Sequence, residues 1–156
     1  MAEYTASAVQ TVNPGESIIF SEAPVPCRRG LVRHRDESGN FLLSGRPTVN
    51  MPFGCGCPCC CPKSLVYPVA FGANIAIPTD GTVEEISVSI AIDGGTIPAS
   101  EMIVTPAAVE EYTNVSRETN AEVWLGCCET VTVRNTSTQP ILVQDANLVI
   151  GRPSYN

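Results

Sequence analysis

Alternation of apolar and polar residues near the end of the chain is the feature that most limits its fold. Residues 127–136 and residues 144–150 both alternate in this way. A period of two is typical of a β-strand with one buried face. Because the two segments follow each other closely, we expect them to form the closing hairpin of an antiparallel β domain.

Short strands separated by glycine and proline extend this pattern through the rest of the chain. The 13 prolines and 12 glycines leave no long window for a helix. We expect further strands at 17–20, 31–34, 39–45, 65–77, 83–93, 97–104 and 114–125. Short strands of this kind, without the spacing of βαβ units, indicate a sandwich or a jelly roll.

The segment 65–77 shows which side of a strand faces the core. Its more apolar side carries Tyr67, Val69, Phe71, Ala73 and Ile75. Pro68 lies on the other side and has no N–H to donate to a neighbouring strand. We therefore expect this strand to begin at a sheet edge or at a bulge.

Length and composition predict one folded domain of 156 residues. We expect residues 1–12 to form an N-terminal arm and residues 13–156 a jelly-roll domain with a Cys/Pro-rich loop at 46–63. Charged residues make up only 16% of the chain, against about 25% in an average globular protein. A surface with so few charges indicates that part of it is covered by other subunits.

Several classes of function are disfavoured by the sequence. The net charge of -7 argues against nucleic-acid binding, which needs clustered Lys and Arg. No apolar run reaches the ~20 residues of a membrane span, and the first residues do not resemble an export signal. No phosphate loop, catalytic triad or paired acid and base is recognisable. We expect no enzymatic activity and no cofactor.

Five of the eight cysteines are clustered in the Cys/Pro-rich loop. A zinc site usually combines two separate C-x-x-C knuckles, and this loop offers that spacing only from Cys57 to Cys60. Free thiols or disulfides are therefore favoured over a bound metal, which stays open as the alternative. Both interpretations concern Cys55, Cys57, Cys59, Cys60 and Cys61.

The order of several short motifs resembles a known family. The motifs are NPGE at 13–16, GNFLL at 39–43, VAFGANI at 69–75, SVSIAIDG at 87–94, CC at 127–128 and NLVI at 147–150. Together they are similar to the C1q/TNF-like jelly-roll modules of Firmicutes and their phages, some of which form the heads of collagen-like spore-surface filaments. The similarity covers residues 13–153.

The resemblance implies an all-β, antiparallel jelly-roll sandwich of about ten strands that packs as a homotrimer. Aromatic and aliphatic residues would line the threefold axis. The 156 residues contain no collagen-like Gly-X-Y repeat, so we expect the chain to correspond to a free-standing head of the family. The resemblance also implies that Cys127 and Cys128 are structural, and alternation would place one inward and one outward. Cys27 is interpreted as a third structural thiol.

The functional expectation is a non-enzymatic, trimeric component of a phage capsid surface, of the head-decoration or head-fibre type. It would be assembled in the host bacterial cytoplasm, reside on the virion surface and contact the capsid or another particle lattice through the N-terminal arm. A structural protein of the spore surface is one alternative. A trimeric head that binds a host receptor or glycan through Tyr112 or Tyr155 is another.

Overall fold

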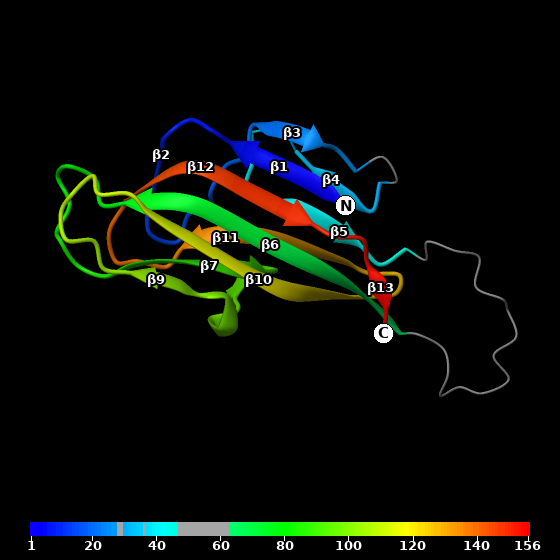
Figure 1. Ribbon diagram of the computed structural model, residues 1–156. Coiled ribbons are helices and arrows are strands. Elements are labelled where there is room, and N and C mark those ends of the chain that lie inside the picture. Colours follow the sequence, from blue (N-terminus) through cyan, green and yellow to red (C-terminus); the bar gives the residue numbers. More distant parts are fainter. Residues whose placement is uncertain (28–29, 36, 47–62) are drawn as a thin grey trace, which may run out of the picture.

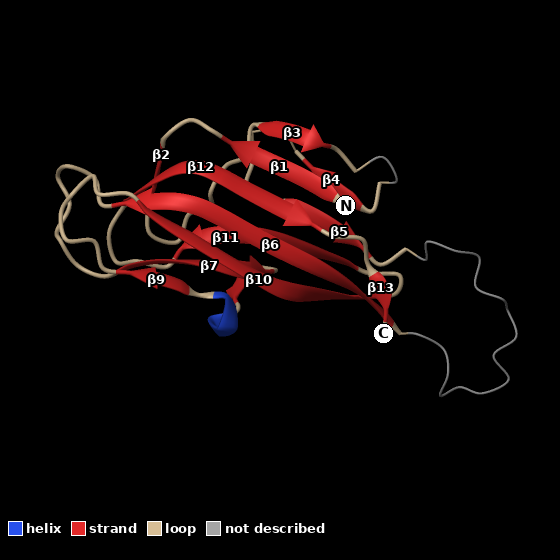
Figure 2. Cartoon of the chain, viewed as in Figure 1, coloured by secondary structure: helices blue, strands red, loops and turns tan. Residues whose placement is uncertain are grey.

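Two antiparallel β-sheets packed face to face make up the computed structural model (Figure 1). The structure describes residues 1–27, 30–35, 37–46 and 63–156. Nearly all of this part of the chain is strand or loop, apart from the short 3-10 helix η1 at Pro98–Ser100 (Figure 2). The all-β sandwich predicted from the alternation is confirmed.

Sheet A has the strand order β10-β6-β12-β1-β3, with β2 beside β12 and β13 beside β6. Every pair of neighbours is antiparallel, and β6 pairs with β10 from Ser64 to Ile75. The strands are β1 (Ala2–Ala6), β2 (Gln10–Val12), β3 (Glu22–Val25), β6 (Ser64–Ala76), β10 (Thr113–Trp124), β12 (Ile141–Ile150) and β13 (Ser154–Tyr155).

Sheet B has the strand order β4-β5-β11-β7-β8, with β9 beside β7. Its strand β7 lies within the segment 83–93, where a strand was expected, and its residues Ile86, Val88 and Ile90 are fully buried. The strands are β4 (Val32–His34), β5 (Phe41–Ser44), β7 (Ile86–Ile92), β8 (Gly95–Thr96), β9 (Met102–Val104) and β11 (Cys128–Asn135).

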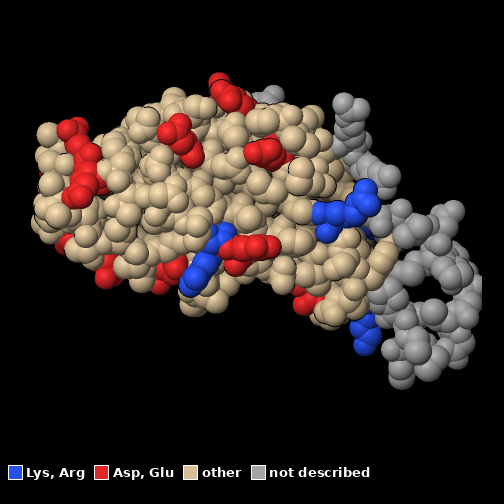
Figure 3. Space-filling view, in the orientation of Figure 1, with Lys and Arg blue, Asp and Glu red and all other residues tan. Residues whose placement is uncertain are grey.

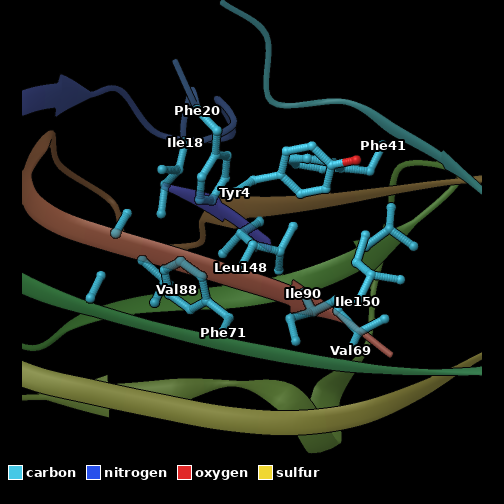
Figure 4. Packing of buried hydrophobic residues seen from close by; sticks show 14 of the residues in the cluster. Tyr4, Ile18, Phe20, Phe41, Val69, Phe71, Val88, Ile90, Leu148 and Ile150 are labelled. Atoms are coloured by element: carbon cyan, nitrogen blue, oxygen red, sulfur yellow. The ribbon is translucent and has the colours of Figure 1, made fainter. Parts of the chain in front are cut away.

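The core lies between the two sheets, and aromatic side chains fill one part of it (Figure 4). The ring of Phe41 lies 4.7 Å from that of Tyr4 and 5.3 Å from that of Phe20. The single histidine, His34, stacks on Phe41 at 4.5 Å and donates a hydrogen bond from Nε2 to the carbonyl of Ser38 at 2.9 Å. His34 therefore has a structural position in the described chain.

Residues 2–6 form a strand inside sheet A, where the sequence led us to expect an N-terminal arm. Strand β1 pairs with β12 along its whole length, from Ala2 opposite Ile150 to Ala6 opposite Ala146, and it also contacts β3. Its alternate residues Ala2, Tyr4 and Ala6 are buried. The sandwich thus begins at residue 2 and not at residue 13.

The two C-terminal strands do not form the hairpin that the sequence predicted. Strand β11 pairs with β5 and β7 in sheet B, whereas β12 pairs with β1, β2 and β6 in sheet A. The chain crosses from one sheet to the other between Asn135 and Ile141. Alternation shows that one face of a strand is buried, but it does not show which sheet the strand joins.

Two smaller expectations also change. Residues 17–20 were expected to form a strand, but Ser17 bridges to Arg134 and Phe20 to Ser38, so the segment changes partner before a ladder forms.

Pro68 lies inside sheet A and not at an edge or a bulge. It is tolerated because the ladder with β12 ends at Val69 and the ladder with β13 starts at Val66, so no N–H is required between them.

Within the part of the chain that the structure describes, no helix has the length and apolar character needed to cross a membrane. The predicted Cys/Pro-rich loop begins at the described Arg46 and ends at the described Lys63. Residues 47–62 lie outside the described residues, and the interpretation of their cysteines stays a prediction.

Candidate self-association surface

The outward face of sheet A, which points away from the core, has an unusual composition along β6. Leu65, Tyr67, Val69, Phe71 and Ala73 alternate into the core and are buried. The residues between them face outward and are half-buried in the single chain. We call the outward residues Val66, Pro68, Ala70 and Gly72, together with Val149 on β12, the β6 strip.

The β6 strip is neutral, and carboxylates lie on either side of it. Ala70 pairs with Val149 on one side and with Glu118 on the other, and Val149 pairs in turn with Glu3. This row across sheet A therefore consists of Glu118, Ala70, Val149 and Glu3, with the two apolar residues between the two carboxylates. The next row holds the small or polar residues Ser116, Gly72, Asn147 and Thr5.

Figure 3 shows the molecule from the side on which β6, β10 and β12 lie in front. Much of this surface is uncharged, and acidic side chains are spread over it singly or in small groups, one of them with a basic side chain beside it. In an antiparallel sheet with one solvated face, the residues that point to solvent are normally polar. A sheet face that instead presents four successive non-polar positions on one strand is suited to contact with another protein surface.

One end of the outward face carries the only tryptophan of the chain. Trp124 ends β10 and is 54% exposed, although it is a large aromatic residue. Glu122, which precedes it on the same face, accepts hydrogen bonds from the Ser64 hydroxyl and from the side-chain amide of Asn156. The bond from Ser64 first, and that from Asn156 second, lower the pKa of Glu122, which keeps this carboxylate charged beside Trp124.

The β10–β11 turn at this same end presents two cysteines to solvent. Cys127 and Cys128 are both exposed, so the expectation that one would point inward is wrong. Cys27 is half-buried and packs against the core. Burial, followed by the charges of Cys27 and Cys128, raises the pKa of Tyr67 to about 12. The Tyr67 hydroxyl donates a hydrogen bond to the carbonyl of Ser44, and Ser44 pairs with Cys128, so Cys128 lies at the same end of the sandwich as the Tyr67 hydroxyl.

The other predicted site residues are not brought together. Tyr112 is 38% exposed and directly precedes the residue that pairs with Ile75 of β6. Tyr155 pairs with Leu65 at the opposite end of that strand, so the two tyrosines cannot form one aromatic platform.

Among the described residues, no cluster of three or more metal-ligating side chains occurs. The cysteines proposed as metal-ligand candidates, Cys55, Cys57, Cys59, Cys60 and Cys61, lie outside the described residues.

The sequence could have revealed the β6 strip, although we did not single it out as a site. Residues 66, 68, 70 and 72 include no charged or hydrogen-bonding side chain. A strand whose two faces both lack polar groups is typical of burial on both sides. That signal was present in the alternation of segment 65–77, but it did not specify what would cover the second face.

Comparison with solved structures places this arrangement among known folds. The globular domain of zebrafish complement 1qA superposes with a TM-score of 0.55 at 10% identity, over 95% of this chain and 94% of that one. The Eiger TNF of S. frugiperda gives 0.60 at 9% identity, over 97% and 90%. Murine APRIL gives 0.53 at 8% identity, over 97% and 98%.

The chain has a C1q/TNF-like fold. This finding confirms the jelly-roll architecture that the order of sequence motifs implied. No family model matches the chain, and no curated protein matches it in sequence. At identities near one residue in ten, the likeness of this C1q/TNF-like domain to the solved structures concerns its fold alone.

Proposed function

We propose that this C1q/TNF-like domain forms a homotrimer, and that the trimer is a non-catalytic structural module. The observation that carries the proposal is the β6 strip, which is covered by the neighbouring copy in the trimer. A closed ring of three copies uses two different patches on each subunit, so the strip of one copy contacts another part of the next. The low share of charged residues fits a chain that buries surface in this way.

Ala70→Arg tests the proposed homotrimer. The substitution places a guanidinium in the middle of the β6 strip, where the side chain has room in a single copy but is desolvated in an interface. Desolvating the guanidinium in an interface costs several kcal/mol even though Glu118 lies opposite position 70 in the same sheet, so we expect self-association to weaken about 100-fold or more. Native mass spectrometry with reductant should show three chains of 16.6 kDa for the unchanged protein and single chains for the variant.

Leu42→Arg is the matched control, because Leu42 lies on β5 in sheet B and is also half-buried. We expect this variant to remain trimeric. Trp124 supplies a second measurement, since burial of a half-exposed indole shifts its emission to shorter wavelength. When the protein without substitutions is diluted until the trimer dissociates, its Trp124 emission should return to longer wavelength. A folded monomer at micromolar concentration, or an Ala70→Arg variant that stays trimeric, would contradict the proposed interface.

We further propose that the trimer decorates the capsid of a phage that assembles in the bacterial cytoplasm, and so is located on the virion surface. The order of sequence motifs that resembles phage and spore-surface modules supports this assignment. The spore surface is the second candidate for the same reason. Since residues 2–6 belong to the sandwich, attachment through an N-terminal arm would require opening of sheet A and is not part of this proposal.

Labelling of intact particles distinguishes these two surfaces. Antibodies raised against the recombinant trimer are applied to purified phage particles and to spores from the producing cells, and binding is scored by immunogold electron microscopy. We expect regular labelling of capsids, with particles from a strain lacking the gene as the control. Labelling of spores alone would overturn the capsid assignment and would leave the proposed homotrimer untouched.

A further inference from the structure

The turn between β10 and β11 holds two neighbouring thiols in a defined backbone conformation. The amide of Cys127 donates to the carbonyl of Trp124 at 3.0 Å, and the carbonyl of Cys127 accepts from Gly45 at 2.8 Å. The amide of Gly126 donates to Gly45 at 3.1 Å, and Gly126 adopts a positive φ of 86°, which glycine tolerates without strain. The position of both cysteines is thus fixed by the fold.

The two thiols are exposed, and they are poorly placed to bond to each other. Both Cys127 and Cys128 are free thiols on the surface. Consecutive Cα atoms are about 3.8 Å apart, whereas the Cα atoms of a relaxed disulfide are usually about 4.4–6.8 Å apart. Each thiol therefore bonds more favourably to a cysteine elsewhere than to its neighbour.

This pair of thiols follows directly on Trp124, at the point where the chain leaves sheet A for sheet B. Trp124 shares the outward face of sheet A with the β6 strip, and the hydrogen bond from Cys127 to Trp124 closes the turn directly behind it. An interface that covers Trp124 brings the β10–β11 turns of the three copies to the same end of the trimer. Cys27 differs, because it is half-buried and packs against the core of its own chain.

We propose that Cys127 of each copy forms a disulfide with Cys128 of the next copy, so that three disulfides close the trimer into a covalent ring. This inference rests on the homotrimer proposed above. Two adjacent cysteines give each chain one thiol for each neighbour, which is what a cyclic trimer requires. The ring consumes all six thiols that Cys127 and Cys128 of the three copies provide.

The oxidation is balanced by a small-molecule disulfide such as oxidised glutathione. A Cys127 thiolate attacks one glutathione sulfur and releases one reduced glutathione. The Cys128 thiolate of the next copy then attacks the protein sulfur of this mixed disulfide and releases the second. Each ring disulfide therefore consumes one oxidised glutathione and yields two reduced ones, and closing the ring consumes three.

The test uses the full chain with the other six cysteines replaced by serine, incubated with oxidised glutathione. We expect one band at the mass of three chains on a non-reducing denaturing gel, which collapses to one chain with reductant. Trypsin without reductant should release residues 118–134, since Arg117 and Arg134 flank this segment and it contains no other Lys or Arg. The ring predicts three copies of this peptide joined, six hydrogen atoms lighter than three separate peptides.

Cys127→Ser and Cys128→Ser, each made in that background, are the controls. Either leaves one thiol per chain, so the covalent product should stop at two chains while the native trimer persists in reductant. A reduced trimer whose oxidation yields only single chains, or peptide 118–134 with an internal disulfide, would overturn the ring but not the homotrimer. A reduced monomer would overturn the homotrimer itself.

Discussion

Removal of residues 1–6 is expected to leave the domain unfolded. Strand β1 lies between β12 and β3 in sheet A, so its loss leaves β3 and residues 146–150 of β12 without their hydrogen-bonding partner. The buried side chains of Ala2, Tyr4 and Ala6 are lost with it. The Tyr4 ring also contacts Phe41 from the other sheet at 4.7 Å, so the truncation opens the core as well as the sheet.

The magnitude of this effect follows from the size of Tyr4. Truncating one large buried aromatic residue typically costs about 3–5 kcal/mol, and the total stability of a domain is about 5–15 kcal/mol. Loss of the whole strand should therefore exceed what the fold can tolerate. Circular dichroism and thermal melting measure this directly, and removal of Met1 alone, which is 68% exposed, is the control with an unchanged melting temperature.

A truncated chain that still folds and melts as a cooperative unit would contradict this prediction. It would show that residues 1–6 can detach from sheet A and would restore the N-terminal arm expected from the sequence. The truncated chain expected here, in contrast, loses trimerisation and particle binding together, because both need the folded sandwich. For that reason, a truncation that abolishes attachment does not by itself identify an attachment site.

The strands whose sequences alternate cleanly were predictable, because alternation reports burial on one face. β7 lies within the segment 83–93, and the inward side of β6 carries the expected aromatic and aliphatic residues. The segment 114–125 alternates less regularly, but β10 lies close to it. Strand β1 was missed because it has only five residues, and its buried side carries two alanines and one tyrosine. This short pattern carries little signal without its neighbour β12.

Partner choice between strands was the part that the sequence could not supply. The segments ending in Asn135 and beginning at Ile141 have the period of paired strands, yet they belong to different sheets. Where the chain crosses between the sheets, the buried side chain of Asn135 bonds to the nearby Ser137 and Gln139 and to Val12, which is distant in sequence. The candidate interface could be predicted only in part. The sequence shows that one side of β6 is neutral, but it does not show that Val149 and Glu3, on other strands, lie beside it.

Asn135→Ala is expected to destabilise the domain by about 3–5 kcal/mol. Asn135 is fully buried at the end of β11, and its amide nitrogen donates to the carbonyls of Val12 and Gln139, each at 2.9 Å. Its side-chain oxygen accepts from the amide of Ser137 at 2.8 Å. The substitution removes the partners of two buried backbone groups, at Val12 and Ser137, and of the half-buried Gln139 carbonyl; a buried group left unpaired costs about 1–3 kcal/mol. Urea denaturation at one fixed protein concentration measures the loss.

Asn40→Ala is the matched control, because Asn40 is exposed and surface substitutions usually change stability by no more than about 0.5 kcal/mol. Asn135→Asp separates hydrogen bonding from packing, since it keeps the shape of the side chain. One oxygen of the introduced carboxyl can still accept from the Ser137 amide, but the other faces the carbonyl oxygens of Val12 and Gln139. Burial and these two oxygens raise the pKa of the carboxyl in the folded state above that in the unfolded chain.

A raised folded pKa gives the Asn135→Asp variant more stability at low pH than at neutral pH. Below the unfolded pKa of about 3.9 the carboxyl is protonated in both states and can donate to Val12 or Gln139; as the pH rises through the folded pKa, this contribution is lost. The variant should therefore approach the unchanged protein as the pH falls. Both Asn135 variants could instead prove as stable as Asn40→Ala. The crossing from β11 to β12 would then depend on packing alone, and the hydrogen bonds of Asn135 would not direct these strands to different sheets.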